Sequence, residues 1–198
     1  MLLTGAFHED GLADVADGLG GSADRGRALE IMKDSRVGAF GAIAVVLVLL
    51  SKVALLALLG DISAPLMVAA LLGAHVVSRT WPLLTIRLLK HVGDAAGSKS
   101  KPLADQISGA ALVTGFVWCF MAFGLVCYAQ KATDAIAIVS ASGSLLQALG
   151  VAVLASGLAW AAMTRWFWRR LGGFTGDCLG ATQQVCELAF YLGLALSL

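Results

Sequence analysis

The sequence predicts an all-α fold: a polytopic transmembrane bundle of about five helices, with short amphipathic helices on its cytoplasmic side. Hydrophobic residues make up 59% of the 198 residues and charged residues only 14%, whereas about a quarter of the residues in a soluble domain are charged. The apolar residues are also gathered into runs, and a helix of about 20 such residues crosses a bilayer. Composition and run length therefore favour a single integral-membrane domain over residues 1–198.

Three apolar runs are long enough to span a membrane. They are Phe40 to Gly60, Gln106 to Ala129 and Ala135 to Met163. Two further runs, 64–77 and 185–198, are shorter than a usual span and are expected to tilt or to lie in locally thinned lipid. The sequence leaves the paths of these two runs open.

Basic residues are concentrated in three segments, one before the first expected span and two between later spans. With five crossings all three segments lie on one side, which the positive-inside rule places in the cytoplasm. A mobile basic loop is expected at 93–102, where it could close over a ligand. The net charge of only +1 gives no field that would attract nucleic acid. The three segments hold Arg25, Arg27, Lys33 and Arg36; Arg79, Arg87, Lys90, Lys99 and Lys101; and Arg165, Arg169 and Arg170.

Acidic residues are concentrated near the start of the chain, where seven of the thirteen lie between Glu9 and Asp34. Asp10, Asp14 and Asp17 follow one another at i, i+4 and i+7, so on a helix they share one face. Like charges on one face repel and weaken the helix. A magnesium ion would reverse that effect, because Mg²⁺ binds carboxylates and bridges them to substrate phosphates. The alternative is a solvated acidic helix face, and the spacing alone does not decide between the two.

Two further segments carry groups that bind phosphate. Asp24 is expected to cap a helix over 25–35, which brings Lys33, Asp34 and Arg36 to the membrane surface. The glycine-rich segment 172–181 could present backbone N–H groups to an anion, with Thr175 or Asp177 as the helix cap. It could equally be a helix–helix turn in which small residues pack closely.

Two charged residues fall inside expected spans. Lys52 lies in the first span and Glu187 in the last, and each would be costly in lipid. They either pair with each other or line a cavity, and the sequence leaves both possibilities open.

Three motifs, together covering essentially the whole chain, resemble those of the cobalamin synthase family, the adenosylcobinamide-GDP ribazoletransferases. This family usually has a hydrophobic residue where Glu9 stands here. It generally has further membrane sequence ahead of the first motif, so the chain is expected to be N-terminally short. The motifs are His8-x-Asp10-Gly11-Leu12-Ala13-Asp14-x-x-Asp17-Gly18, Glu30-Ile31-Met32-Lys33-Asp34-Ser35-Arg36-x-Gly38 and Gly172-Gly173-x-Thr175-Gly176-Asp177-x-Leu179-Gly180-Ala181.

The resemblance implies the last assembly step of the cobalamin nucleotide loop. The adenosylcobinamide-phosphate moiety of adenosylcobinamide-GDP would pass to α-ribazole or its 5′-phosphate, with release of GMP. The implied cofactor is Mg²⁺, and the implied location is the inner membrane of a prokaryote, with the active site facing the cytoplasm. The expected partners are these substrates and the lipid bilayer, but no nucleic acid, and a homo-oligomer is left open.

The resemblance also suggests roles for individual residues. Asp10 and Asp14 would hold the metal, and Asp17 and Asp34 would be further ligands or the base that accepts the proton of the attacking hydroxyl. His8 would bond a phosphate or orient a carboxylate. The residues expected to bind phosphate are Lys33, Arg36, Arg79, Thr175, Gly176 and Asp177.

Two other functions fit less well. A phospholipid-making CDP-alcohol phosphotransferase would need arginine where Asp14 stands, followed by a spaced glycine and two more aspartates. A carboxylate-coupled transporter would place its acids near mid-membrane, whereas this cluster precedes the first span. The identity of the lower base, the phosphorylation of the acceptor and the oligomeric state cannot be read from the sequence.

Overall fold

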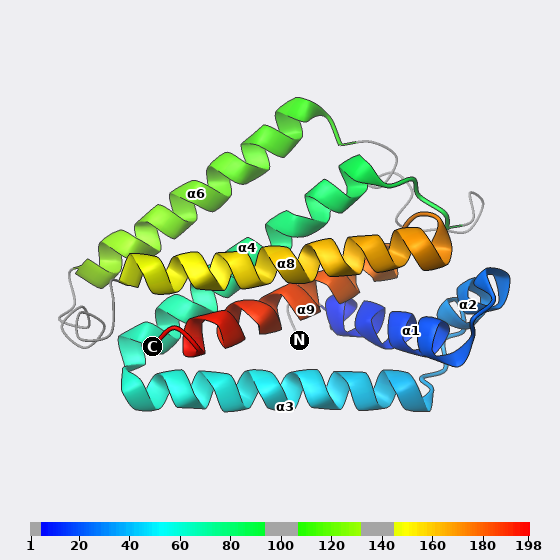
Figure 1. The fold of residues 1–198 in the computed structure, drawn as a ribbon, viewed down its shortest axis with the longest axis horizontal. Coiled ribbons are helices and arrows are strands. Elements are labelled where there is room, and N and C mark those ends of the chain that lie inside the picture. Colours follow the sequence, from blue (N-terminus) through cyan, green and yellow to red (C-terminus); the bar gives the residue numbers. More distant parts are fainter. Residues whose placement is uncertain (1–4, 94–106, 132–144) are drawn as a thin grey trace.

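The protein is an elongated bundle of helices, described by the computed structural model for residues 5–93, 107–131 and 145–198 (Figure 1). The predicted all-α bundle is confirmed, since these residues contain no strand beyond an isolated bridge between His91 and Phe174. Most of the expected loop 93–102, and the first residues of the expected span 135–163, lie outside the described ranges. The helices are α1 (Phe7–Gly21), α2 (Arg25–Met32), α3 (Ala39–Ile62), α4 (Ala64–Leu88), α6 (Gly109–Lys131), α8 (Leu145–Leu171) and α9 (Gly176–Ala195).

In the described part of the chain, three helices are long and apolar enough to cross a membrane: α3, α4 and residues 146–171 of α8. The apolar part of α6, Gly109–Leu125, is shorter. Helix α3 follows the expected first span closely. Helix α8 continues past residue 163 to Leu171 and so includes Arg165, Arg169 and Arg170, the basic segment that we expected to follow the span.

Helix α4 corrects the sequence expectation of a short run over 64–77. It continues to Leu88, over 25 residues, with Pro82 inside it. The polar residues after Val77 do not end the helix because they have partners within the bundle. The hydroxyl of Ser78 accepts a hydrogen bond from Gln183 Nε2 at 3.1 Å, and the Thr80 hydroxyl donates to the carbonyl of Val76 at 3.0 Å.

Helix α9 is the central helix of the bundle and packs against α1, α3, α4 and α8. It begins at Gly176, well before the expected apolar run at 185–198, and most of its residues are buried. Hydropathy did not include the polar middle of this helix in the expected span, because its polar side chains face other helices rather than lipid. This stretch contains Thr182, Gln183, Gln184 and Glu187, all of them buried.

A buried ion pair ties α9 to α3. Lys52 Nζ lies 3.0 Å from Glu187 Oε2 and donates to Gln184 Oε1 at 2.6 Å. Gln183 Nε2 and the Tyr191 hydroxyl donate to the two oxygens of Glu187 at 2.7 and 3.1 Å. Of the two possibilities left open by the sequence, pairing is therefore the one observed. With all these donors the pair avoids the cost of an isolated charge in an apolar bundle.

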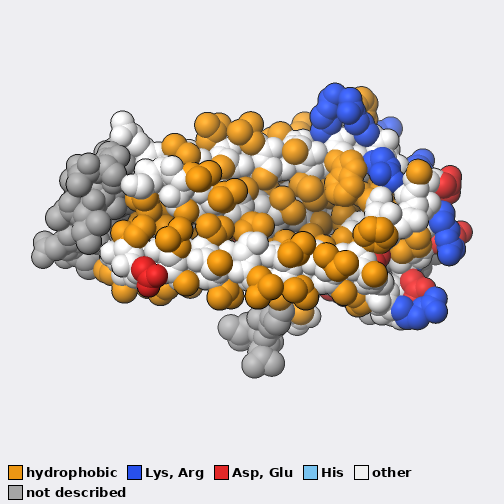
Figure 2. Space-filling view, turned by 60° about the horizontal axis from the view of Figure 1, so that its bottom comes forward, with side chains coloured by type: hydrophobic (Ala, Val, Ile, Leu, Met, Phe, Trp, Pro, Cys, Tyr) orange, Lys and Arg blue, Asp and Glu red, His pale blue; other side chains and the backbone are white. Residues whose placement is uncertain are grey.

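The described parts of the three basic segments meet at one end of the bundle, as their expected common side requires. The chain after α4 meets the chain after α8, because Phe174 N donates to Lys90 O and Val92 N donates to Phe174 O, each at 2.9 Å. Arg170, at the end of α8, donates to the carbonyl of Ser22 just after α1, at 2.6 Å. Figure 2 shows lysine and arginine gathered at this end, with a largely hydrophobic flank along the rest of the bundle. We call it the charged end.

Breaking the buried ion pair should destabilise the bundle. We expect Lys52→Met to lower the free energy of unfolding by about 3–5 kcal/mol, because Glu187 would remain buried without its cation. Adding Glu187→Gln to that variant should restore part of the loss. The measurement is thermal unfolding of the purified protein in detergent, and a single variant as stable as the parent would contradict the pair's role.

Candidate active site at the charged end

Helix α1 packs within the bundle, although its place in the sequence before the first span suggested a position at the membrane surface. It starts about midway along the bundle and runs to the charged end, antiparallel to α9 (Figure 1). The two helices touch at glycines: a Cβ on Gly11 would lie 2.8 Å from the carbonyl oxygen of Asp177, and one on Gly180 would lie 3.2 Å from that of His8. The approach at Gly11 is too close for any side chain, and the one at Gly180 is tighter than most Cβ contacts. The contact brings the carboxylates of α1 beside the first turn of α9.

Asp10, Asp14, Asp17 and Asp177 form a group of like charges, which we call the carboxylate cluster. Asp14 is half-buried, and its pKa is raised to about 7 by desolvation and then by the negative charges of Asp177, Asp10 and Asp17. In the ranges that the structure describes, no three His, Cys or acidic side chains stand close enough together to hold a metal ion by themselves. The cluster is thus a region of strong negative potential, not a closed cage.

Asp17 has a structural partner that the sequence did not suggest. Its Oδ2 accepts from the backbone N–H of Gly38 at 2.7 Å and its Oδ1 from that of Gly41 at 2.9 Å. These amides begin α3, whose own N-cap residue makes no side-chain cap. A carboxylate at the positive end of a helix dipole is stabilised there. Asp17 therefore joins α1 to the first span, and this role accounts for its burial without a metal.

The second motif forms a small helix and a turn. The side chain of Asp24 caps α2 by accepting from Arg27 N at 2.8 Å, as predicted, and Lys33 is the C-cap residue. In the turn that follows, Arg36 donates to Asp34 from its backbone N and from Nε, at 3.1 and 2.9 Å. This partner lowers the pKa of Asp34 to about 2. Asp34, which is not part of the carboxylate cluster, and Arg36 therefore hold each other.

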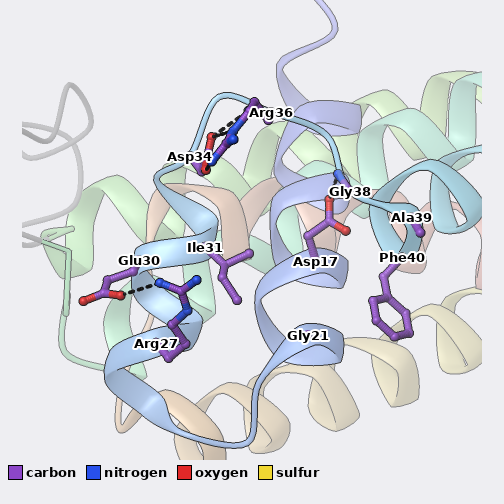
Figure 3. Close-up of a pocket in the computed structure, with 10 residues that line it drawn as sticks. All are labelled: Asp17, Gly21, Arg27, Glu30, Ile31, Asp34, Arg36, Gly38, Ala39 and Phe40. Carbon is purple, nitrogen blue, oxygen red and sulfur yellow. Dashed lines mark hydrogen bonds and ion pairs between the residues drawn. The ribbon is translucent and has the colours of Figure 1, made fainter.

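An open hollow of about 350 Å³ lies between the end of α1, helix α2 and the start of α3 (Figure 3). It contains three of the predicted site residues, Asp17, Asp34 and Arg36. Its full lining is Asp17, Gly21, Arg27, Glu30, Ile31, Asp34, Arg36, Gly38, Ala39 and Phe40.

The third motif starts α9. Thr175 is the N-cap, and its hydroxyl accepts from Cys178 N at 3.4 Å and donates to Asp177 Oδ2 at 3.2 Å. Of the two predicted caps, Thr175 is therefore the one that caps. Gly176 is the first residue of the helix. The turn before it uses Gly172 at a φ of +69°, a left-handed conformation that favours glycine.

Arg79 and His8 lie near each other, since the charge of Arg79 acts on the His8 ring. Arg79 Nη1 donates to the carbonyl of His75 at 3.0 Å and lies 2.8 Å from His75 Nδ1. Burial lowers the pKa of His8, and the positive charge of Arg79 lowers it further. These two residues therefore lie near the start of α1, which we call the inner side of the site. Asp34 and Arg36 lie near the end of α1, on the outer side.

Sequence reasoning missed three groups at the site. His75 holds Arg79, and the i, i+4 spacing of the two residues on α4 was a usable signal. Arg170 bonds the carbonyls of Leu19 and Ser22, which end α1; its role could not be seen because the partners are 151 and 148 residues away. Glu9 has an oxygen, Oε2, that is buried without a hydrogen-bond partner in the described structure.

Comparisons with known proteins agree with the motifs. The family described as cobalamin-5-phosphate synthase matches residues 1–195. Proteins named adenosylcobinamide-GDP ribazoletransferase are 79% identical in Albidiferax ferrireducens, over 198 residues (all of this chain and 71% of the relative), and 59% identical in a Polaromonas species, over 212 residues (all of this chain and 70% of the relative). A third, from Polaromonas naphthalenivorans, is 60% identical over 209 residues, which cover 99% of this chain and 70% of the relative. No solved structure matches the chain.

The raised pKa of Asp14 predicts a pH dependence of stability. The carboxyl titrates near 7 in the folded protein and near its ordinary value of 3.8 when unfolded, so between these values the folded state binds more protons. The stability that protonated Asp14 contributes is fully present below about pH 4 and is lost as the pH rises to about 7.

We therefore expect Asp14→Asn to lessen the fall of the unfolding temperature between pH 4 and 7 in metal-free detergent solution. The matched control is Asp61→Asn, at the far end of α3, which should keep the parent's profile. Parallel profiles for Asp14→Asn and the parent would contradict the assignment.

Proposed function

The chain belongs to the cobalamin-5-phosphate synthase family, and we propose that it transfers the adenosylcobinamide-phosphate moiety of adenosylcobinamide-GDP to α-ribazole or its 5′-phosphate. The acceptor hydroxyl oxygen bonds to the cobinamide-side phosphorus, the bond from that phosphorus to the oxygen of GMP breaks, and GMP leaves. The product is adenosylcobalamin or its 5′-phosphate. This membership leaves no support for a phospholipid enzyme or a transporter.

The observation that carries the proposal is the carboxylate cluster on α1 and α9. Burial and like charges push the Asp14 pKa to about 7, so the site favours an added positive charge. Mg²⁺ is commonly held by one or two carboxylates together with substrate phosphates and water. The lack of a three-ligand cage among the described residues therefore fits an ion that arrives with a diphosphate. Asp10 and Asp14 would hold it, and when bound it would neutralise charge on the transferring phosphoryl group.

Of the four carboxylates expected to bind metal, two have other partners. Asp17 accepts two backbone hydrogen bonds at the start of α3, and Asp34 is bonded to Arg36. A carboxylate with a pKa near 2 is also a poor proton acceptor at neutral pH. We therefore assign Asp17 to holding α3 and Asp34 to holding Arg36, and leave the metal to Asp10 and Asp14.

Asp177 is the carboxylate we assign to the proton of the attacking hydroxyl. It lies on the first turn of α9 and acts electrostatically on Asp14. The Thr175 hydroxyl bonded to its Oδ2 fixes the orientation of the carboxylate. On the inner side, His8 and Arg79 supply hydrogen-bond donors for the phosphates, while Lys33 and Arg36 supply positive charge on the outer side.

The location follows from the distribution of charge. The charged end holds the three basic segments, and the positive-inside rule assigns such segments to the cytoplasm. We propose that the protein lies in the inner membrane of a prokaryote, with the carboxylate cluster open to cytoplasmic substrates.

The reaction is tested directly with membranes that contain the chain. Supplied with adenosylcobinamide-GDP, α-ribazole and Mg²⁺, they should release GMP and form adenosylcobalamin in equal amounts, both followed by chromatography. Absence of GMP release, under conditions in which a known synthase is active, would contradict the function.

Asp10→Asn should reduce turnover by at least about a hundredfold, because one of the two carboxylates that hold the metal is lost. Binding is checked separately from activity: in the presence of GDP, Mg²⁺ should raise the unfolding temperature of the parent at pH 8 and leave that of the variant unchanged. Asp61→Asn, a matched change at the opposite end of the bundle, should behave as the parent. A variant still stabilised by Mg²⁺ would place the metal elsewhere.

A further inference from the structure

The hollow at the charged end has apolar surfaces between its charged side chains. Gly21, on the last turn of α1, contributes no side chain, and a Cβ there would first meet Ile31 Cδ1 at 3.5 Å. Ile31 enters the hollow from α2, and Phe40 stands on the α3 side (Figure 3). The Phe40 ring is 56% exposed although it lies beside charged residues. These surfaces suit a flat ring, and about 350 Å³ is ample for a purine base.

The rim of the hollow carries two guanidinium–carboxylate pairs. Arg27 Nη1 lies 3.0 Å from Glu30 Oε2, in a pair about two-thirds exposed, and Arg36 is paired with Asp34. The two pairs differ in strength. Arg36 bonds Asp34 through its backbone N, Nε and Nη2, whereas an exposed pair such as Arg27–Glu30 is held weakly and can exchange partners at little cost.

A guanidinium beside a carboxylate matches the edges of guanine. Guanine presents two acceptors, O6 and N7, which suit the fork of an arginine, and a donor amino group at N2. Its N1–H and N2 amino group point the same way and suit the two oxygens of a carboxylate. Adenine offers an amino group where guanine has O6, so it would meet Arg27 with a donor against a donor.

We propose that the hollow is the guanine subsite of the donor nucleotide. Glu30 accepts from N1–H and from the N2 amino group, Arg27 donates to O6 and N7, and Phe40 packs against the face of the base. This inference rests on the proposed function only in that the donor is a guanosine diphosphate derivative.

The position of the hollow relative to the carboxylate cluster supports this assignment. Asp17 both lines the hollow and acts on Asp14 electrostatically, so the two sites adjoin along α1. At 1.5 Å per residue, Gly21 is about 10 Å further along the helix than Asp14. A nucleoside held in the hollow can therefore extend its diphosphate along α1 toward Asp14 and Asp10.

The test compares adenosylcobinamide-GDP with its inosine analogue, which differs from it only in lacking the N2 amino group. We expect the parent to have a kcat/KM at least about tenfold higher for the guanosine donor, the effect of one lost hydrogen bond to a charged group. Glu30→Gln should lower that kcat/KM to the level of the inosine donor, because its amide oxygen accepts one bond and its NH₂ group opposes the second. Asp61→Asn is the matched control and should keep the preference.

A second pair of variants checks the rest of the subsite. Phe40→Ala should raise KM for both donors by a similar factor, because stacking does not depend on the N2 group. Arg27→Gln should do the same, since both bases carry O6 and N7. A rise in KM confined to the guanosine donor, in either variant, would overturn the assigned contacts.

The outcomes separate this inference from the function on which it rests. Transfer from both donors at equal kcat/KM by the parent, or a preference that survives in Glu30→Gln, would overturn the guanine subsite and leave the transferase activity standing. Absence of transfer from either donor would overturn the proposed function itself.

Discussion

The close contact of α1 with α9 is the constraint on which the site depends. Because Gly11 lies against the backbone of Asp177 and Gly180 against that of His8, the first and last described helices of the chain form one antiparallel pair. The catalytic groups proposed here come from both partners, so neither helix carries the site alone. A bulkier residue at either glycine would separate the carboxylates and widen the gap that the substrate phosphates have to bridge.

The same contact creates an electrostatic cost that the fold offsets in different ways along α1. At the outer end Asp17 is stabilised by the amides that begin α3. Farther in, Asp14 receives no such support and takes up a proton more readily instead. One helical face thus contains a carboxylate committed to structure and others open to a cation. This difference is the physical basis for dividing the four predicted ligands into two that we propose hold metal and two that hold the protein together.

Much of the architecture could be predicted from the sequence. The bundle, the first span, the shared end of the three basic segments and the caps at Asp24 and Thr175 all follow from hydropathy, charge and local capping rules. The errors in the helix ends have one cause: hydropathy carries no information on the hydrogen-bond partners of polar side chains. Ser78 and Gln183 satisfy each other across α4 and α9, so neither helix ends where its polar residues begin. The structural role of Asp17 could not be predicted either, since its spacing indicates a metal ligand, a base or a solvated acid until the start of α3 is placed against it.

The ion pair between Lys52 and Glu187 also bears on how the chain enters a membrane. Helix α9 has four buried polar residues from Thr182 to Glu187 and would be unstable in lipid on its own. Helix α3, in contrast, is almost wholly apolar around its one lysine. Because the chain is synthesised from its N-terminus, α3 with Lys52 is made before α9 with Glu187. Helix α9 can then insert directly against protein, and it completes the site to which α1 contributes its carboxylates.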